Sequence, residues 1–287
     1  MSREISSFRT PADEDEYMAA YDEALKLWPI PYEEEYVLTR FGITHVIVSG
    51  PKGAPALVLF HPAGCGAIIW YRNVEAFSQH YRIYAVDVIG EVNKSVVTHR
   101  IRSRQELADW VEELLKGLQI DKADIVGNSF GGFLAFNTAL LLPGRVGKVV
   151  LISPAATFAQ MWSWGWYFIP AYGTGWKPLL RKAFDWIWQD FDADDCISNI
   201  RQLAGVNGVP RHIPPSIFSD EELRKVSTPV LLLIGDREVI YKPETAIRRA
   251  TRLVPGLQAE VIPNANHNAE YTAPEQVNKK VMDFLLS

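Results

Sequence analysis

Short apolar runs that alternate with helix-like segments constrain the fold of this chain most strongly. The runs typical of strands are A-L-V-L-F-H (56–61), R-I-Y-A-V-D (82–87), A-D-I-V-G-N (123–128), K-V-V-L-I-S (148–153), T-P-V-L-L-L-I-G (228–235) and A-E-V-I-P (259–263). Near-continuous apolar strands that are separated by helices indicate a parallel sheet covered on both faces. The sequence therefore predicts an α/β fold around a mostly parallel, twisted sheet.

Helical spacing of apolar residues fills the intervals between these runs. The predicted helices cover residues 14–28, about 70–80, 104–118, 130–142, about 243–253 and about 272–286. Before the first apolar run, Y-V-L-T-R-F-G-I-T-H-V-I-V-S-G (36–50) predicts an antiparallel hairpin that turns at Phe41 and Gly42. This hairpin would supply an antiparallel edge to the sheet.

The alternation stops after Pro154 and resumes at residue 228, which divides the chain into three parts. Residues 1–34 are expected to form an N-terminal helical extension. Residues 35–153 and 228–287 are expected to form the α/β core. Residues 154–227 are expected to be a helical cap, or lid, inserted into that core.

Composition excludes several classes of protein. With 287 residues and 48% hydrophobic composition, the chain can bury a large core without disulfides or metal. The formal charge of −5 gives no broad basic surface for nucleic acid. A polar N-terminus and the lack of an apolar run of about 18 residues argue against a signal peptide and a membrane span. We therefore expect a cytoplasmic protein that acts on a small molecule; the oligomeric state stays open, a dimer included.

Ser129 lies between glycines where a predicted strand ends and a predicted helix begins, in I-V-G-N-S-F-G-G-F (125–133). This is the arrangement of a nucleophile elbow, in which a sharp turn lifts a serine hydroxyl above the sheet edge. Gly127 and Gly131 would allow the strained backbone and the close approach of strand and helix. The alternative is an ordinary structural turn.

A serine hydroxyl needs a base, and the base needs a carboxylate that orients it. His267, in P-N-A-N-H-N-A-E-Y, follows the last strand at the edge of the sheet where catalytic groups collect; a polar loop histidine is the alternative. The other histidines, His212 among them, lack comparable placement. G-D-R-E-V-I-Y offers Asp236 and Glu238 as the acid, so the order along the chain is Ser, acid, His.

These motifs, together with F-H-P-A-G and D-V-I-G-E-V-N-K-S (87–95), resemble the α/β-hydrolase fold family, and more closely its bacterial carboxylesterase-like members. The resemblance covers roughly residues 35–287. It implies Glu238 rather than Asp236 as the acid, as the fourth residue of a G-x-x-[DE] stretch. It also implies that the backbone N–H groups of Phe130 and Ala63 bind the oxyanion of the tetrahedral intermediate.

Two positions depart from the family pattern. Pro62 stands where glycine is usual in the oxyanion loop, and it has a fixed φ and no N–H. Asn266 stands where glycine commonly precedes the catalytic histidine. Both flank the reaction centre, so altered chemistry or weak hydrolysis is compatible with them.

Most of the nine tryptophans fall within residues 162–188, inside the predicted cap. Packing of a small cap onto the body explains many of them. The remainder would line an apolar substrate pocket. The candidates are Trp162, Trp166, Phe168 and Trp186.

Taken together, the sequence predicts a serine hydrolase without cofactor or metal that cleaves a carboxylic ester of a moderately apolar small molecule through an acyl-enzyme. One alternative is a thioesterase, a lactonase or a non-hydrolytic enzyme of acyl transfer, cyclisation or elimination. The other is a receptor-like protein that binds a ligand and turns it over feebly.

Overall fold

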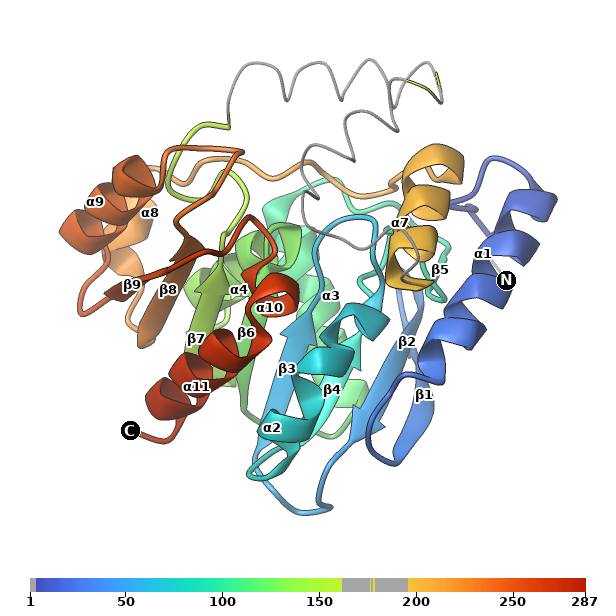
Figure 1. The fold of residues 1–287 in the computed structure, drawn as a ribbon, viewed down its shortest axis with the longest axis horizontal. Coiled ribbons are helices and arrows are strands. Elements are labelled where there is room, and N and C mark those ends of the chain that lie inside the picture. The colour runs from blue at the N-terminus through green and yellow to red at the C-terminus, as the bar shows by residue number, and fades with distance from the viewer. Residues whose placement is uncertain (1–3, 162–175, 177, 179–195) are drawn as a thin grey trace.

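The residues that the structure describes form a nine-stranded sheet, which lies at the centre of the molecule (Figure 1). The computed structural model describes residues 4–161, 176, 178 and 196–287. The strands are β1 (Tyr32–Thr39), β2 (Gly42–Ser49), β3 (Ala56–Phe60), β4 (Arg82–Val86), β5 (Val96–Val97), β6 (Ala123–Asn128), β7 (Val146–Ile152), β8 (Val230–Gly235) and β9 (Gln258–Ile262). Their order is β1-β2-β4-β3-β6-β7-β8-β9, with β5 paired to β2.

The sheet is parallel except at its N-terminal edge. β1 and β2 form an antiparallel hairpin, and β2 pairs antiparallel with β4. From β4 through β3, β6, β7 and β8 to β9, all neighbours run parallel. The predicted α/β fold with an antiparallel hairpin at one edge is therefore confirmed.

Helices cover both faces of the sheet. They are α1 (Pro11–Leu25), the 3-10 helix η1 (Ala67–Arg72), α2 (Val74–Ser78), α3 (Arg104–Gly117), α4 (Phe130–Leu141), the 3-10 helix η2 (Pro143–Arg145), α7 (Cys196–Asn207), α8 (Asp220–Lys225), α9 (Pro243–Leu253), α10 (Ala269–Thr272) and α11 (Pro274–Leu285). In Figure 1, α2 and α11 lie in front of the sheet, and α3 and α4 lie behind it. None of the described helices is long and apolar enough to cross a membrane.

Two hydrophobic cores result, one on each face of the sheet. Successive side chains of a strand point to opposite faces. Accordingly, Val58 and Phe60 of β3 lie in the core under α3 and α4, whereas Leu57 and Leu59 lie in the core under α2 and α11. Burial on both faces explains why the strands read as continuous apolar runs in the sequence.

Some elements differ from the sequence predictions. Helix α1 begins at Pro11 because the Thr10 side chain accepts a hydrogen bond from the Asp13 N–H and caps the helix. The helix predicted for residues 272–286 is confirmed as α11, which begins at Pro274, and the short helix α10 that precedes it was not predicted. The sequence did not predict β5. Helices α7 and α8 lie within residues 154–227, which were expected to form a helical cap, but their bounds were not predicted.

Strand β1 begins at Tyr32, so its first residues belong to the sheet rather than to the extension expected for residues 1–34. Glutamate is a poor strand former, which hid this start in the sequence. Here Glu33 lies 3.1 Å from the Lys52 ammonium and 3.2 Å from the Arg82 guanidinium. The exposed edge thus carries paired charge.

The described ends of the expected cap, residues 154–227, pack on the rest of the molecule. Phe158 and Phe218 contact Phe136 of α4, with ring centroids 5.2 Å and 4.8 Å apart. Helix α7 lies beside α1 (Figure 1), and the Arg9 N–H donates to the Asn207 carbonyl. Phe158 and Phe218 thus belong to the core under α3 and α4, whereas Ile197 and Ile200 of α7 belong to the core on the other face of the sheet.

Candidate active site

Ser129 occupies a strained turn between β6 and α4. Its φ of 50° and ψ of −114° lie outside the regions that L-residues favour. The surrounding backbone holds this conformation, because the Ser129 N–H donates to the Ile152 carbonyl at 3.0 Å and the Ser129 carbonyl accepts from the Ala155 N–H at 2.9 Å. The hydroxyl is consequently presented above the carboxyl edge of the sheet.

The glycines on either side of Ser129 allow the turn to pack tightly. A Cβ on Gly127 would lie 2.2 Å from the Gly131 carbonyl oxygen. A Cβ on Gly131 would lie 2.1 Å from the Phe60 carbonyl oxygen and 2.7 Å from that of His61. Both positions therefore require glycine for close approach, as the sequence predicted.

Three loops bring Ser129, His267 and Glu238 together. His267 Nε2 lies 2.9 Å from Ser129 Oγ, and His267 Nδ1 lies 2.7 Å from Glu238 Oε2. Since a carboxylate only accepts hydrogen bonds, His267 Nδ1 carries the proton, and Nε2 is free to accept the serine hydroxyl. This geometry lets the imidazole take a proton from Ser129.

The Glu238 side chain is fully buried, whereas Asp236 is exposed. Burial acts to raise the pKa of Glu238, but the His267 imidazole and the Ile240 N–H outweigh it and hold that pKa below its usual value. Glu238 Oε1 accepts from the Ile240 N–H at 2.8 Å. The carboxylate is thus fixed in its charged form beside His267, in the position that the family pattern assigns to the acid.

Asn128, which sequence reasoning did not select, anchors the histidine loop. Its side-chain amide donates to the His267 carbonyl at 3.3 Å and to the buried Glu270 carboxylate. The departure at Asn266 has a local role, since its Oδ1 accepts from the Asn268 N–H at 2.9 Å. The sequence signal for the role of Asn128 was its position as a polar residue directly before Ser129.

The predicted oxyanion donors lie at the ends of two different elements. Phe130 is the first residue of α4, where backbone N–H groups have no partner inside the helix. Ala63 lies in the loop after β3 and is exposed. Among the described residues, neither N–H has a hydrogen-bond partner, so both are free to bind a ligand.

His61 has a structural role, since both of its ring nitrogens form hydrogen bonds with backbone groups. Its Nδ1 donates to the Pro62 carbonyl at 2.7 Å, and its Nε2 accepts from the Val88 N–H at 3.0 Å. The ring is therefore neutral, with the proton on Nδ1. It fixes the loop that starts at Pro62 to the loop after β4.

His212, which no sequence pattern placed near the site, forms another histidine–carboxylate pair beside these groups. His212 Nε2 lies 2.5 Å from Glu91 Oε1, and Glu91 Oε2 accepts from the Gly64 N–H at 2.9 Å. The imidazole also stacks on the Phe130 ring, with centroids 4.1 Å apart. No sequence pattern marked this pair, because its members are 121 residues apart.

The pair perturbs both of its titratable groups. Burial acts to raise the pKa of Glu91, but the His212 imidazole and the Gly64 N–H outweigh burial and lower that pKa. Burial acts to lower the pKa of His212, but Glu91 and the Ile213 carbonyl outweigh burial and raise it. The charged forms of both groups are therefore favoured.

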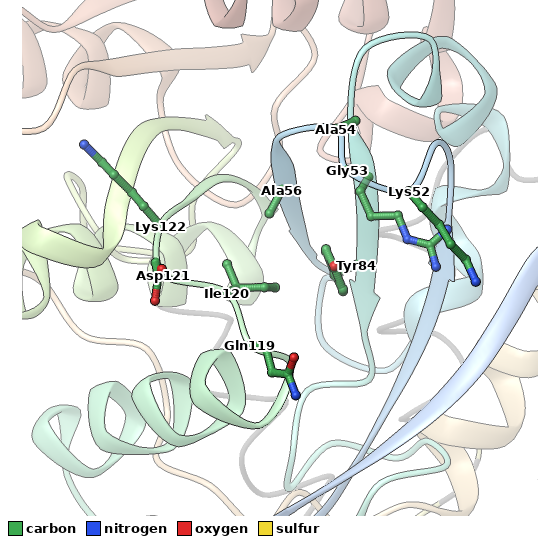
Figure 2. A pocket seen from close by; sticks show the side chains of 10 residues that line it. Lys52, Gly53, Ala54, Ala56, Tyr84, Gln119, Ile120, Asp121 and Lys122 are labelled. Carbon is green, nitrogen blue, oxygen red and sulfur yellow. The ribbon is translucent and has the colours of Figure 1, made fainter.

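A surface hollow is lined by residues from several loops and strands, among them Ala56, Tyr84 and Ile120 (Figure 2). Its lining includes Ala56 and Arg82, which are the first residues of the parallel strands β3 and β4, whereas Ser129 follows the last residue of β6. The hollow is thus separate from the candidate site. Within the described residues, no group of three or more His, Cys, Asp or Glu side chains is arranged to hold a metal ion.

The aromatic residues predicted to line the substrate pocket are not placed by this structure. Trp162, Trp166, Phe168 and Trp186 lie outside the described residues. Their role in substrate binding stays a prediction.

Residues 57–280 match the sequence profile of the Alpha/beta hydrolase family. The carboxylesterase YbfK of Bacillus subtilis is 39% identical over 94% of this chain and 93% of its own length. The uncharacterized carboxylesterase nap of the same organism is 38% identical over 99% of this chain and 97% of its own length. The chain belongs to the α/β-hydrolase family, as its motifs indicated.

Solved structures agree with these sequence relatives. The crystal structure of B. subtilis carboxylesterase CesB (YbfK) superimposes with a TM-score of 0.89 at 35% identity, over 96% of this chain and 98% of that one. That of B. subtilis naproxen esterase (carboxylesterase NP) gives 0.90 at 37% identity, over 96% and 99%. The predicted enzyme class, a carboxylic-ester hydrolase, agrees with this similarity.

The close approach of Gly131 to the Phe60 carbonyl predicts that an alanine at position 131 lowers both stability and activity. Gly131→Ala should lower the free energy of unfolding by about 1–3 kcal/mol or more, because the new Cβ meets the rigid Phe60 carbonyl. It should also lower ester hydrolysis, since relief of the contact displaces α4 or the loop after β3. Urea unfolding and hydrolysis of a p-nitrophenyl ester measure the two effects.

Gly144→Ala is the matched control, because a Cβ on this exposed glycine meets nothing within 4 Å. It should leave both stability and activity unchanged. A Gly131→Ala enzyme as stable and active as the Gly144→Ala enzyme would contradict the tight packing described above.

The shifted pKa values of Glu91 and His212 predict a pH window for their contribution to stability. The Glu91 contribution is present above its ordinary pKa of 4.5 and is lost as pH falls through the lowered folded value. The His212 contribution is present below its ordinary pKa of 6.5 and is lost as pH rises through the raised folded value. The pair therefore stabilises the fold most between pH 4.5 and 6.5.

Urea unfolding of the native protein and of a Glu91→Gln/His212→Gln double variant across this pH range measures the effect. All other titrating groups are common to both proteins and cancel in the difference. The difference in free energy of unfolding should be largest inside the window and should shrink on both sides. A difference that grows steadily above pH 7 would contradict the charged pair.

Proposed function

We propose that this protein hydrolyses carboxylic esters through an acyl-enzyme, with Ser129 as nucleophile, His267 as general base and acid, and Glu238 as the residue that orients His267. The observation that carries the proposal is the continuous chain of hydrogen bonds from Ser129 Oγ through His267 to Glu238. The carboxylesterase relatives support the reaction class.

Acylation begins when Ser129 Oγ attacks the ester carbonyl carbon and His267 Nε2 takes the serine proton. The carbonyl π electrons move to oxygen, and the backbone N–H groups of Phe130 and Ala63 bind this oxyanion. Glu238 stabilises the imidazolium. The tetrahedral intermediate then expels the alcohol, which receives the proton from His267.

Deacylation repeats these steps with water. His267 Nε2 takes a proton from a water molecule, whose oxygen attacks the acyl carbon of the Ser129 ester. Collapse of the second tetrahedral intermediate breaks the bond between the acyl carbon and Ser129 Oγ, and His267 returns the proton to Ser129. The products are a carboxylic acid and the free enzyme.

We propose a moderately apolar ester as the substrate. The similarity to an esterase named for naproxen supports an apolar acyl group, and the aromatic residues of 162–188 are suited to bind one. A panel of p-nitrophenyl esters of graded chain length, a naproxen ester, thioesters and lactones would rank these substrates. Higher kcat/KM for thioesters or lactones than for any ester would redirect the assignment.

Substitution of the triad tests the proposal. Ser129→Ala should abolish labelling by a fluorophosphonate probe and lower kcat about 10⁴–10⁶-fold, as removal of a triad member does in serine hydrolases. Glu238→Gln should lower kcat strongly, because the carboxylate that stabilises the imidazolium is lost. Asp236→Asn is the matched control and should leave kcat/KM unchanged.

Two outcomes would contradict this mechanism. Persistent turnover and labelling of the folded Ser129→Ala protein would reject Ser129 as nucleophile. A large loss of kcat in Asp236→Asn, with none in Glu238→Gln, would reject Glu238 as the orienting acid.

A further inference from the structure

Two loops that follow neighbouring strands of the sheet are bound together beside the candidate oxyanion site. The loop after β3 carries Ala63, and the loop after β4 supplies two buried carboxylates. Asp87 Oδ1 accepts from the Ala67 N–H at 2.6 Å, and Glu91 Oε2 accepts from the Gly64 N–H at 2.9 Å. The Glu91 bond is made at the residue directly after Ala63.

His212 holds Glu91 in place and is itself a cation by geometry. His212 Nδ1 lies 2.7 Å from the Ile213 carbonyl, and His212 Nε2 lies 2.5 Å from the Glu91 carboxylate. Both neighbours only accept hydrogen bonds, so both ring nitrogens carry protons. The side chain is 6% exposed and that of Glu91 is 1% exposed, which makes this a buried ion pair.

The same imidazolium supports the second oxyanion donor. Its ring is nearly parallel to that of Phe130, at an interplanar angle of 20° with centroids 4.1 Å apart. On another side, Phe130 contacts Phe133, so the position of the Phe130 side chain is fixed from two directions. His212 therefore contacts Phe130 directly and reaches the loop of Ala63 through Glu91.

Pro62 and its neighbours limit the movement of the peptide that carries the Ala63 N–H. Proline fixes its own φ, and His61 Nδ1 donates to the Pro62 carbonyl at 2.7 Å, which holds the Pro62–Ala63 peptide. The Glu91 bond to the Gly64 N–H holds the next peptide along the chain. The peptide that carries the Ala63 N–H is thereby held from both ends. A buried ion pair is a weak source of net stability compared with apolar packing, so its position beside Ala63 and Phe130 calls for a further role.

We propose that His212 is a positioning residue that aligns both backbone donors of the oxyanion hole, one by stacking on Phe130 and the other through Glu91 and Gly64. This inference rests on the proposed function, which assigns the Phe130 and Ala63 N–H groups to the oxyanion. Positioning of donors acts on the tetrahedral state and leaves binding of the planar ester nearly unchanged.

The His212→Gln and Glu91→Gln variants test this role. Complete loss of one oxyanion donor costs about 10²–10³-fold in kcat, so a misaligned pair should cost about 10–100-fold in His212→Gln. Glu91→Gln should cost less, because the glutamine oxygen can still accept from the Gly64 N–H. KM should stay nearly constant in both, and the Ki of a trifluoromethyl ketone, which forms a tetrahedral adduct with Ser129, should rise in proportion to the loss in kcat.

Tyr81→Phe is the matched control for a lost buried hydrogen bond. The Tyr81 hydroxyl donates to Asp124 at 3.0 Å, next to the start of β4 and away from Ser129. This variant should lose thermal stability but keep kcat, KM and the Ki of the ketone. Thermal unfolding of all three variants separates a general loss of stability from a specific loss of alignment.

Three results would overturn the inference. They are unchanged kcat and Ki in folded His212→Gln, a loss of kcat without a matching rise in Ki, or equal effects in Tyr81→Phe. Where His212→Gln fails to fold, Glu91→Gln carries the same comparison, because its amide keeps the shape of the carboxylate. None of these results affects the Ser129→Ala test, so failure of this inference is distinguishable from failure of the proposed function.

Discussion

The strained backbone of Ser129 is the constraint on which the rest of the structure depends. A positive φ at a residue with a Cβ is unfavourable, and it persists because the Ser129 backbone is bonded to both Ile152 and Ala155. Those bonds require β7 to lie against β6, and the close approach of α4 requires glycine at 127 and 131. The parallel sheet and its two cores thus hold the Ser129 backbone in a conformation that the local sequence would not adopt by itself.

The features that could be predicted from sequence are those that local patterns encode. Runs buried on both faces, such as Ala56–Phe60, are apolar along their whole length, so their strands were evident. Ser129 lies in a glycine pattern between a strand and a helix, and His267 follows the last strand. Glu238 depended on the family pattern, because Asp236 stands in the same loop; the hydrogen bond from His267 Nδ1 distinguishes the two.

The features that could not be predicted depend on contacts between distant segments. His212 and Glu91 lie in different loops, and neither has a neighbouring residue that marks an ion pair. Asn128 binds the histidine loop across 139 residues. The start of β1 was hidden because glutamates at an exposed edge lack an apolar pattern, although Glu33 forms ion pairs in the folded protein. Such tertiary contacts position the site, whereas local sequence supplies its reactive groups.

The claim that Ser129 carries the acyl group during turnover is tested most directly by trapping that intermediate. Acid quenching of the enzyme during rapid turnover of a p-nitrophenyl ester, followed by proteolysis and mass spectrometry of the peptides, locates the covalent acyl group. We expect a single acylated site at Ser129, formed at the rate of the p-nitrophenol burst. Acylation of another residue, or a burst of product with no acylated peptide, would contradict it.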